Sequence, residues 1–510
     1  MRIEYSRRHT TPVHIGGVTI GDGRPVAVQS MTNTPTMDVE ASAAQCLRIA
    51  GAGADIVRLT AQTPAHARRL GDIRRAVRDA GCDIPLVADI HFNPAAAFAA
   101  AEEVEKVRIN PGNFADPGRT FVKLEYTDEE YADELLRIRR KVTPLLDLCR
   151  SRGVALRIGV NHGSLSDRIM SRYGDTPAGM VESAMEFLRI CRDEDFTDVV
   201  ISIKASNVVV MTSTVRLLAE AMEREGMAYP LHLGVTEAGD GEDARIKSAV
   251  GIGSLLADGI GDTIRVSLTE APEAEIPVAR MLLDHIATRC AAGAAEGEYT
   301  RREPGRDIPA VIGLDEVPAA YTPLRAEHPD IIGRVRRAAA DIPGRIALTA
   351  VYPADMSAEQ VQIAASVDLG SLLLDGLIDA IGIEAPALDP AASQRLALGI
   401  LQATRRRITR TEYIACPGCG RTLYDLQDVL ARVRAATSHL PGLKIGVMGC
   451  IVNGPGEMAD ADYGYVGAGP GRVSLYKGKE CVVKNIPSDE ALPRLIELIK
   501  EGGDWRDADS

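Results

Sequence analysis

Eight short runs rich in β-branched and other apolar residues alternate with amphipathic stretches over the first 290 residues. The runs cover residues 26–30, 55–60, 85–90, 106–110, 155–160, 198–205, 230–235 and 263–268. Helical apolar spacing occurs between them, at residues 41–50, 65–80, 131–150, 181–192 and 214–225. A closed α/β barrel needs eight parallel strands, whereas an open doubly wound sheet, the alternative, usually has fewer. The pattern predicts an α/β fold with an N-terminal (β/α)8 TIM-type barrel at residues 1–290.

Polar side chains stand at the carboxyl ends of these runs, where barrel enzymes carry their chemistry. They include Arg58, Asp89, His91, Arg108, Asn110, Arg157, Asn161, Lys204, Ser206, Glu237, Arg265 and Ser267. Any one of them could instead be solvated or paired with a loop carboxylate. Five cations on one rim favour a phosphate or diphosphate substrate. No Walker A or G-x-G-x-x-G sequence is present, so a nucleotide is not the first expectation.

Composition limits the partners. The formal net charge of the 510 residues is -13, which disfavours non-specific binding to nucleic acid or to an anionic membrane. No apolar stretch approaches the roughly 18 residues of a membrane span, and no secretory or transit segment is evident at the N-terminus. Nine scattered cysteines do not suggest a disulfide framework. We expect a soluble protein of the bacterial cytoplasm.

A change in composition marks an insert at residues 291–408. Residues 291–304 are rich in Ala, Gly and charge and are typical of a linker. Further on, Gly370-Ser-Leu-Leu-Leu-Asp-Gly376 repeats Gly253-Ser-Leu-Leu-Ala-Asp-Gly259, but the second copy has no counterpart of Arg265 and Ser267. Chance similarity of such turns is the alternative. We interpret the insert as a partial α/β duplication that lost the site.

The last part, residues 409–510, is predicted to be an α+β domain that holds a metal. Cys416-Pro-Gly-Cys419 precedes a predicted helix at residues 423–437, and a predicted strand at residues 443–448 leads to Cys450. The C-x-x-C pair alone fits a redox dithiol, a zinc site or half of an iron–sulfur site. The third cysteine favours a metal site over a redox dithiol. Cys481 is a possible fourth ligand, although its strand-like setting suggests burial.

Glu457 is the alternative fourth ligand, placed after a Gly-Pro-Gly turn. A carboxylate suits the exchangeable iron of a [4Fe–4S] cluster better than a structural zinc ion. Glu457 could also simply cap the turn in solvent.

Several motifs together resemble the 4-hydroxy-3-methylbut-2-enyl diphosphate synthase family of the non-mevalonate isoprenoid pathway. The C-terminal motifs are Asn453-Gly-Pro-Gly-Glu457, Cys416-Pro-Gly-Cys-Gly-Arg421 and Met448-Gly-Cys450. Barrel motifs include Asp89-Ile-His91, Arg108-Ile-Asn-Pro-Gly-Asn113, Gly159-Val-Asn-His-Gly163 and Arg265-Val-Ser-Leu-Thr-Glu-Ala-Pro272. The resemblance covers residues 5–290 and 408–505.

The resemblance implies reductive opening of 2-C-methyl-D-erythritol 2,4-cyclodiphosphate to 4-hydroxy-3-methylbut-2-enyl diphosphate and water, by two electrons passed through a [4Fe–4S] cluster. By motif, Cys416, Cys419, Cys450 and Glu457 are the cluster ligands. The barrel cations hold the cyclic diphosphate, and Glu237 handles a proton. No flavin or nicotinamide motif is present, so a separate ferredoxin or flavodoxin is the expected donor.

The insert separates this chain from many bacterial members of the family, which lack one. In two-domain relatives the cluster domain of one subunit covers the barrel of another, so we expect a homodimer, although the insert would allow cover from the same chain. Two other functions stay open. One is a barrel synthase or transferase acting on a pterin or another phosphorylated substrate, with a structural zinc and no need of a reductant. The other is an iron–sulfur carrier, which leaves the barrel cations unexplained.

Overall fold

The structure is a computed structural model that describes residues 3–115, 125–292, 297–303, 305, 308–312, 317, 319–451, 458 and 460–507. Two compact units divide the chain. One comprises His9–Gly239, Gly261–Ile276 and Thr411–Ser510, and the other comprises Met1–Arg8, Asp240–Ile260 and Pro277–Arg410. None of the described helices has the length and apolar character needed to cross a bilayer.

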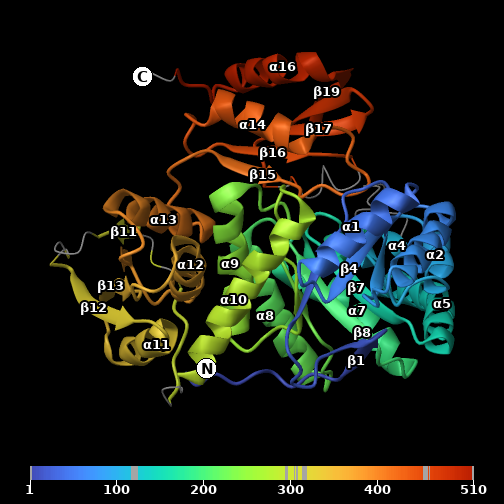
Figure 1. Ribbon diagram of the computed structural model, residues 1–510, viewed down its shortest axis with the longest axis horizontal. Coiled ribbons are helices and arrows are strands. Elements are labelled where there is room, and N and C mark those ends of the chain that lie inside the picture. Colours follow the sequence, from blue (N-terminus) through green and yellow to red (C-terminus); the bar gives the residue numbers. More distant parts are fainter. Residues whose placement is uncertain are drawn as a thin grey trace. The chain divides into compact units, whose positions relative to one another are not determined.

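Eight parallel strands form the barrel of the first unit (Figure 1). They are β3 (Ala27–Met31), β4 (Ile56–Ala61), β5 (Leu86–Ile90), β6 (Lys106–Ile109), β7 (Ala155–Asn161), β8 (Val199–Lys204), β9 (His232–Leu233) and β10 (Thr263–Ile264). The order is β8-β7-β6-β5-β4-β3-β10-β9, and a parallel bridge between Ile201 and Leu231 joins the two ends. The predicted eight-stranded barrel is confirmed.

Burial on both faces explains the apolar character of these strands, since every residue of β5, β6, β7 and β8 is buried. A hairpin of β1 (Val13–Ile15) and β2 (Val18–Ile20) packs its three buried aliphatic residues against Ile56 and Val87, near the amino ends of the strands. The hairpin closes that end, so the carboxyl ends are left for the site.

Helices follow the strands where amphipathic spacing predicts them. The helices of the first unit's barrel part are α1 (Val39–Gly51), α2 (Pro64–Asp79), α3 (Pro94–Ala101), α4 (Pro111–Phe114), α5 (Asp128–Arg152), α6 (Asp167–Tyr173), α7 (Pro177–Asp193) and α8 (Val208–Arg224). Side-chain caps fix the starts of these helices except α3, and α5 begins with a full capping box of Thr127 and Glu130. Gly153, at φ 64°, ends α5 in the left-handed conformation.

A mixed sheet forms the C-terminal part of the same unit. Its strands are β15 (Glu412–Ala415), β16 (Lys444–Met448), β17 (Tyr463–Gly469), β18 (Arg472–Lys477) and β19 (Glu480–Pro487), in sequence order. The first three strands are parallel and the last two antiparallel. Helices α14 (Leu426–Thr437) and α16 (Ser488–Glu501) share one apolar cluster with the sheet, as the α+β prediction requires.

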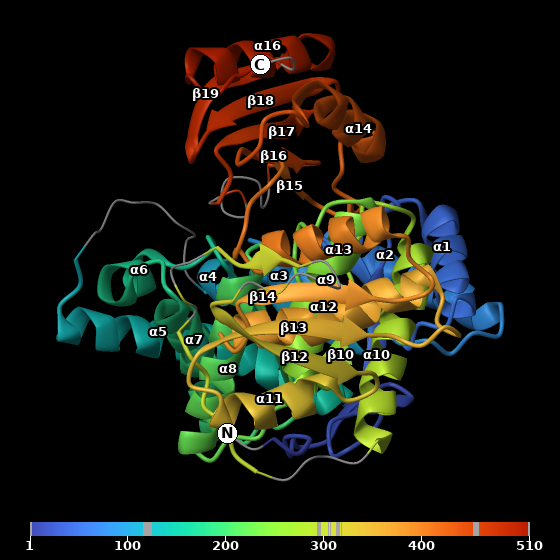
Figure 2. The ribbon, with the colours of Figure 1, turned by 90° about the vertical axis from the view of Figure 1, so that its left-hand side faces the viewer.

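The second unit contains helices α9 (Gly241–Ala257) and α10 (Glu275–Ala291), the latter starting just before the unit's boundary, and a four-stranded parallel sheet (Figure 2). The sheet order is β11 (Ala310–Val311), β14 (Ala380–Glu384), β13 (Arg345–Val351) and β12 (Tyr321–Glu327). Helices α11 (Ile331–Asp341), α12 (Ala358–Leu374) and α13 (Pro390–Ala403) complete it. The units therefore differ from the predicted division into residues 1–290, 291–408 and 409–510, which stays a prediction.

The two copies of the internal repeat form equivalent elements that pack on each other. Each copy ends a helix, α9 or α12, and leads to a parallel strand. The position of a Cβ on Gly253 is occupied by Val367, and that of a Cβ on Gly370 by Val250. Ser371 Oγ donates to Ser254 Oγ at 3.2 Å. Matching glycines in the two copies thus allow the same close approach from both helices.

Candidate active site

The carboxyl ends of the barrel strands and the loops of the C-terminal sheet line one pocket. All of its lining belongs to the first unit. The residues that sequence analysis placed there and the structure brings together are Arg58, Asp89, His91, Arg108, Arg157, Asn161, Lys204, Glu237, Arg265, Ser267, Cys416, Cys419 and Cys450. The two predicted halves of the site, cations and thiols, therefore meet in one space.

Three predicted site residues have other positions. Asn110 is buried, and its side chain accepts from the Gly112 N–H at the start of α4, so it caps that short helix. Ser206 is buried beyond the end of β8 but does not line the pocket. Glu457 lies outside the described residues. Asn110 and Ser206 are therefore not among the described residues that line the pocket.

The cationic side chains of the pocket are buried and repel one another. Burial, together with Arg265 and Arg108, lowers the pKa of Arg58 to about 10. Burial and the neighbouring arginines hold the pKa of Arg157 and that of Lys204 well below their ordinary values. A bound polyanion would reverse this effect, because each positive charge would gain an opposite charge in a low-dielectric setting.

Asp89, His91 and Arg108 form a connected group at the ends of β5 and β6. Arg108 Nη1 donates to Asp89 Oδ1 at 3.1 Å and to His91 Nε2 at 2.8 Å, and Nη2 donates to Asn161 Oδ1 at 2.8 Å. Burial lowers the pKa of His91 to about 3, while Arg58 and the neighbouring groups keep that of Asp89 well below its ordinary value in spite of burial. The ring is therefore neutral, and its Nε2 faces both Arg108 Nη1 and, at 3.2 Å, Asp89 Oδ2.

Arg265 is held by a carboxylate that sequence analysis did not select. Its Nε and Nη2 donate to the two oxygens of Glu275 at 3.1 and 2.9 Å. Ser30 Oγ also donates to Glu275 Oε2, at 2.7 Å. Glu275 is 1% exposed, and this bidentate pair fixes the guanidinium plane at the pocket. In the sequence, Glu275 comes just after the Arg265 to Pro272 motif, and this proximity is the signal that could have identified it.

The three cysteines stand on loops that follow parallel neighbouring strands. Cys416 follows β15, Cys450 follows β16, and the turn to Cys419 passes through Gly418 at φ 77°. The Gly449 N–H donates to Cys416 Sγ at 3.3 Å. Burial raises the pKa of Cys416 to about 12. A thiol in this setting ionises only with a strong local cation, such as a metal.

Arg421, which lies in the Cys416 to Arg421 motif and was not predicted as a site residue, also lines the pocket. It is buried, and its Nη2 lies 3.7 Å from Asp89 Oδ2. Arg421 stands two residues after Cys419, so the cysteine loop that brings the thiols to the pocket also brings a sixth cation. Only two carboxylates, Asp89 and Glu237, are among the described lining residues.

Cys481 does not line the pocket among the described residues. It lies on β19, as the strand-like setting predicted, and is half-buried against the apolar cluster that includes Met448 and Met458. Its Sγ donates to the Val483 carbonyl at 3.7 Å. The structure gives Cys481 a packing role.

Comparison with known proteins finds two family domains in this chain. The GcpE TIM-barrel domain matches residues 10–280, and the GcpE protein C-terminal domain matches residues 412–501. The chain is 50% identical to a protein of Bacteroides fragilis, over 99% of this chain and 97% of that one, and 49% identical to a protein of Parabacteroides distasonis, over 98% and 99%. Both are named 4-hydroxy-3-methylbut-2-en-1-yl diphosphate synthase (flavodoxin). The chain belongs to the GcpE family.

Proposed function

We propose that this chain is a 4-hydroxy-3-methylbut-2-enyl diphosphate synthase. Its substrate is 2-C-methyl-D-erythritol 2,4-cyclodiphosphate. Two electrons and a proton enter, the ring bond between carbon and a phosphate oxygen breaks, a hydroxyl leaves as water, and a carbon–carbon double bond forms. The name that the two relatives carry supports the product, and the cationic site supports the substrate class.

The observation that carries the proposal is the meeting of six cationic side chains and three thiols in one pocket. A cyclic diphosphate supplies the anionic oxygens that the cations need, and its leaving diphosphate group gains charge as the ring opens. Preorganised arginines stabilise the charge that develops in the transition state more than they stabilise the bound substrate. The thiols at the same pocket account for the reductive half of the reaction.

The donor set fits an iron–sulfur cluster. Cys416, Cys419 and Cys450 would hold three irons of a [4Fe–4S] cluster, with Glu457 as the carboxylate ligand of the fourth. Among the described residues, the three Sγ atoms are not all within 4.8 Å of one another, so they are too widely spread for a single metal ion as they stand. A cluster spans a wider donor set and, when bound, supplies single-electron transfer and a Lewis-acidic iron.

The chain's own residues bind and orient the substrate and supply the proton. Arg108 presents one guanidinium edge already fixed by Asp89, His91 and Asn161, and Arg265 is fixed by Glu275. Held in this way, the two guanidinium forks present their positive charge to diphosphate oxygens without reorganisation. Glu237, which is 4% exposed, delivers a proton to the departing hydroxyl oxygen. Burial of the cations excludes water from the developing charge.

The electron donor is a flavodoxin, as the relatives' names indicate for those proteins. Ferredoxin, the other donor expected from the sequence, is the alternative. The chain acts in the cytoplasm as a homodimer, although Arg265 and Cys450 of a single chain line the same pocket.

The test uses protein purified without oxygen. Iron, sulfide and product are measured with the cyclic diphosphate and a reduced flavodoxin system, and an electron paramagnetic resonance spectrum is recorded with dithionite, before and after substrate. Four irons per chain, a substrate-dependent signal and formation of the linear diphosphate are expected. Absence of iron and of product would overturn the proposal, and turnover of a phosphorylated substrate without any reductant would favour a barrel synthase. Arg265→Leu should raise KM without loss of iron, because it removes one fork and leaves the cysteines in place.

A further inference from the structure

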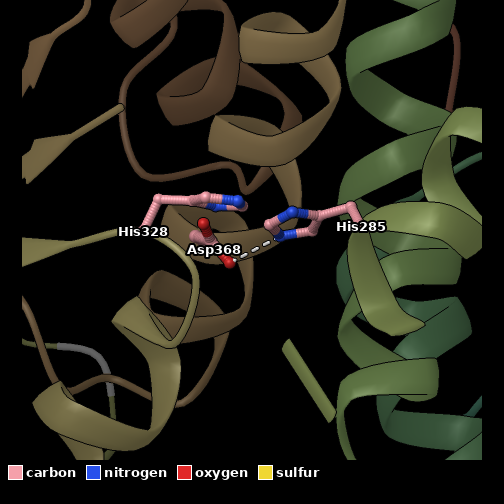
Figure 3. A group of neighbouring side chains, drawn as sticks. All are labelled: His285, His328 and Asp368. Atoms are coloured by element: carbon pink, nitrogen blue, oxygen red, sulfur yellow. Dashed lines mark hydrogen bonds and ion pairs between the residues drawn. The ribbon is translucent and has the colours of Figure 1, made fainter. Parts of the chain in front are cut away.

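A second cluster of ligand-type side chains lies in the unit that contains the insert, apart from the residues of the pocket. His285 is on α10, His328 directly follows β12, and Asp368 is on α12. Figure 3 shows the three side chains pointing toward one another from these separate elements. His285 and Asp368 are buried, and His328 is half-buried. The proposed function does not use any of them.

The spacing of the three side chains is close to that of a single-ion site. His285 Nε2 lies 2.9 Å from Asp368 Oδ1, and one ligand atom from each residue falls within 4.8 Å of the other two. The two imidazole centroids are 5.4 Å apart, with 23° between the ring planes. Two imidazoles bound to one tetrahedral zinc ion have centroids about 5.3 Å apart, from Zn–N bonds of about 2.1 Å. The separation of the two rings therefore matches that of two imidazoles on one ion.

Hydrogen bonding within the described residues does not use the full capacity of the two rings. Nδ1 of His285 and Nδ1 of His328 are both buried and have no hydrogen-bond partner there. Buried polar atoms are normally paired, so an ion bound through the orphaned Nδ1 of His328 would give that atom its missing partner. Burial and His285 lower the pKa of His328, so that ring is neutral, the form that binds metals.

Tyr352 supports the carboxylate from behind. Its Oη donates to Asp368 Oδ2 at 3.1 Å, which leaves Oδ1 directed at His285. Burial and Asp368 raise the pKa of Tyr352 well above its ordinary value, so the phenol keeps the proton that it donates. A hydrogen bond of this kind to a ligating carboxylate is typical of protein metal sites.

We propose that His285, His328 and Asp368 bind one zinc ion. Two imidazole nitrogens favour a transition ion over Mg²⁺ or Ca²⁺, which prefer oxygen ligands throughout. A water completes a four-coordinate shell on the side of the half-buried His328. Because the ligands come from α10, α12 and the segment after β12, the ion joins the helix that ends the barrel sequence to two parts of the insert. Its role is structural, and it adds to folding stability.

The experiment distinguishes an ion bound by His285, His328 and Asp368 from an ion bound by the three cysteines. Protein purified without oxygen, with its iron content measured, is dialysed against a chelator, checked again for iron, and titrated with Zn²⁺ and separately with Co²⁺. We expect one zinc per chain in addition to the iron. Co²⁺ should give visible bands of a four-coordinate nitrogen and oxygen site without the near-ultraviolet thiolate charge-transfer band that cysteine ligands produce. Binding that always carries the thiolate band would overturn the proposal.

Matched variants locate the ion. His328→Gln removes one ligand at the least buried position and should abolish both stoichiometric zinc and the zinc-dependent rise in Tm. His66→Gln is the control, since His66 on α2 hydrogen-bonds with Thr63 and is not part of the cluster, and it should behave as wild type. Tyr352→Phe should weaken zinc affinity about 10- to 100-fold. Equal zinc binding by wild type and His328→Gln, or none by wild type, would show that the cluster is a hydrogen-bonded packing group only. Neither result depends on catalytic activity.

Discussion

Ala238 and Ala415 form an isolated parallel bridge between the loop after β9 and the last residue of β15. The Gly239 N–H donates to the Ala415 carbonyl at 3.3 Å and strengthens it. Glu237 and Cys416, the neighbours of the bridged pair, are thereby placed together, and the electrostatic influence of Glu237 on Cys416 reflects this. Glu237 adopts φ 50°, uncommon for a residue with a side chain. The backbone thus maintains a strained position that sets the acid beside the thiol.

Glu237→Gln should abolish most turnover while the cluster remains. Glutamine keeps the size and the backbone preference of glutamate but cannot supply the proton that the departing oxygen needs. We expect kcat to fall about 100-fold or more, with iron content unchanged and KM within a few-fold. Steady-state kinetics and iron analysis of the same preparation check this. Glu40→Gln on the exposed face of α1 is the control. A variant with normal kcat would remove Glu237 from the reaction.

Cys450→Ser should lose the cluster, and Cys481→Ser should retain it. Cys450 lines the pocket, whereas Cys481 packs on β19 against apolar side chains. Both changes replace sulfur by oxygen in a half-buried cysteine, so they are matched in size and setting. Iron and sulfide content with the visible absorbance of the purified protein distinguishes them. Full absorbance in Cys450→Ser, or its loss in Cys481→Ser, would contradict the ligand assignment.

The barrel was predictable because its strands are buried on both faces and therefore show as separate apolar runs. Helix α9 was not predicted as a helix. Nearly every residue from Ala244 to Ala257 is buried, so the segment lacks the polar face that helical periodicity requires. Its partner α12 is buried in the same way. In the sequence these helices show only as a repeat, and their mutual packing explains why both copies have the glycine.

The barrel half of the site followed from a topological rule, since strand ends in a barrel share one rim. Arg421 and Glu275 did not follow from it, because neither stands at the end of a strand. Arg421 reaches the pocket only through the packing of the cysteine loop against the barrel, and Glu275 acts through its contact with Arg265. Such residues depend on tertiary contacts that local sequence patterns do not encode.

Arg421→Met should weaken substrate binding and leave the cluster in place. Methionine keeps most of the side-chain volume but removes a buried positive charge close to Asp89. We expect KM to rise at least about tenfold, the effect of losing roughly 1.4 kcal/mol of binding, with unchanged iron content. Arg432→Met, on the exposed face of α14, is the control and should match wild type. Unaltered kinetics in Arg421→Met would limit the anion site to the barrel cations.

His91 should make folding sensitive to mild acid. Its pKa is about 3 in the folded chain and 6.5 as the ordinary value, so the unfolded chain takes up the proton first. The contribution to stability is complete above pH 6.5 and is lost as the pH falls toward 3. Between pH 6.5 and 5 the free energy of unfolding should fall by about 2 kcal/mol more in wild type than in His91→Asn. Denaturant unfolding of substrate-free protein across this range measures the difference, and parallel curves would contradict it.

Two impaired variants, assayed at a substrate concentration below the KM of Arg265→Leu, should fail to restore each other if each chain completes its own pocket. Arg265 and Cys450 line the same pocket within one chain, so every chain of a mixed Arg265→Leu and Cys450→Ser dimer carries a defect. Co-expression with two different tags and sequential purification isolates such a dimer, and its activity should equal the mean of the two parent variants. If instead the cysteine loops covered a partner's barrel, one of the two pockets in the mixed dimer would be intact, and about half of wild-type activity would return. A chain that elutes only as a monomer would contradict the predicted homodimer and would leave the self-completed pocket as the sole arrangement.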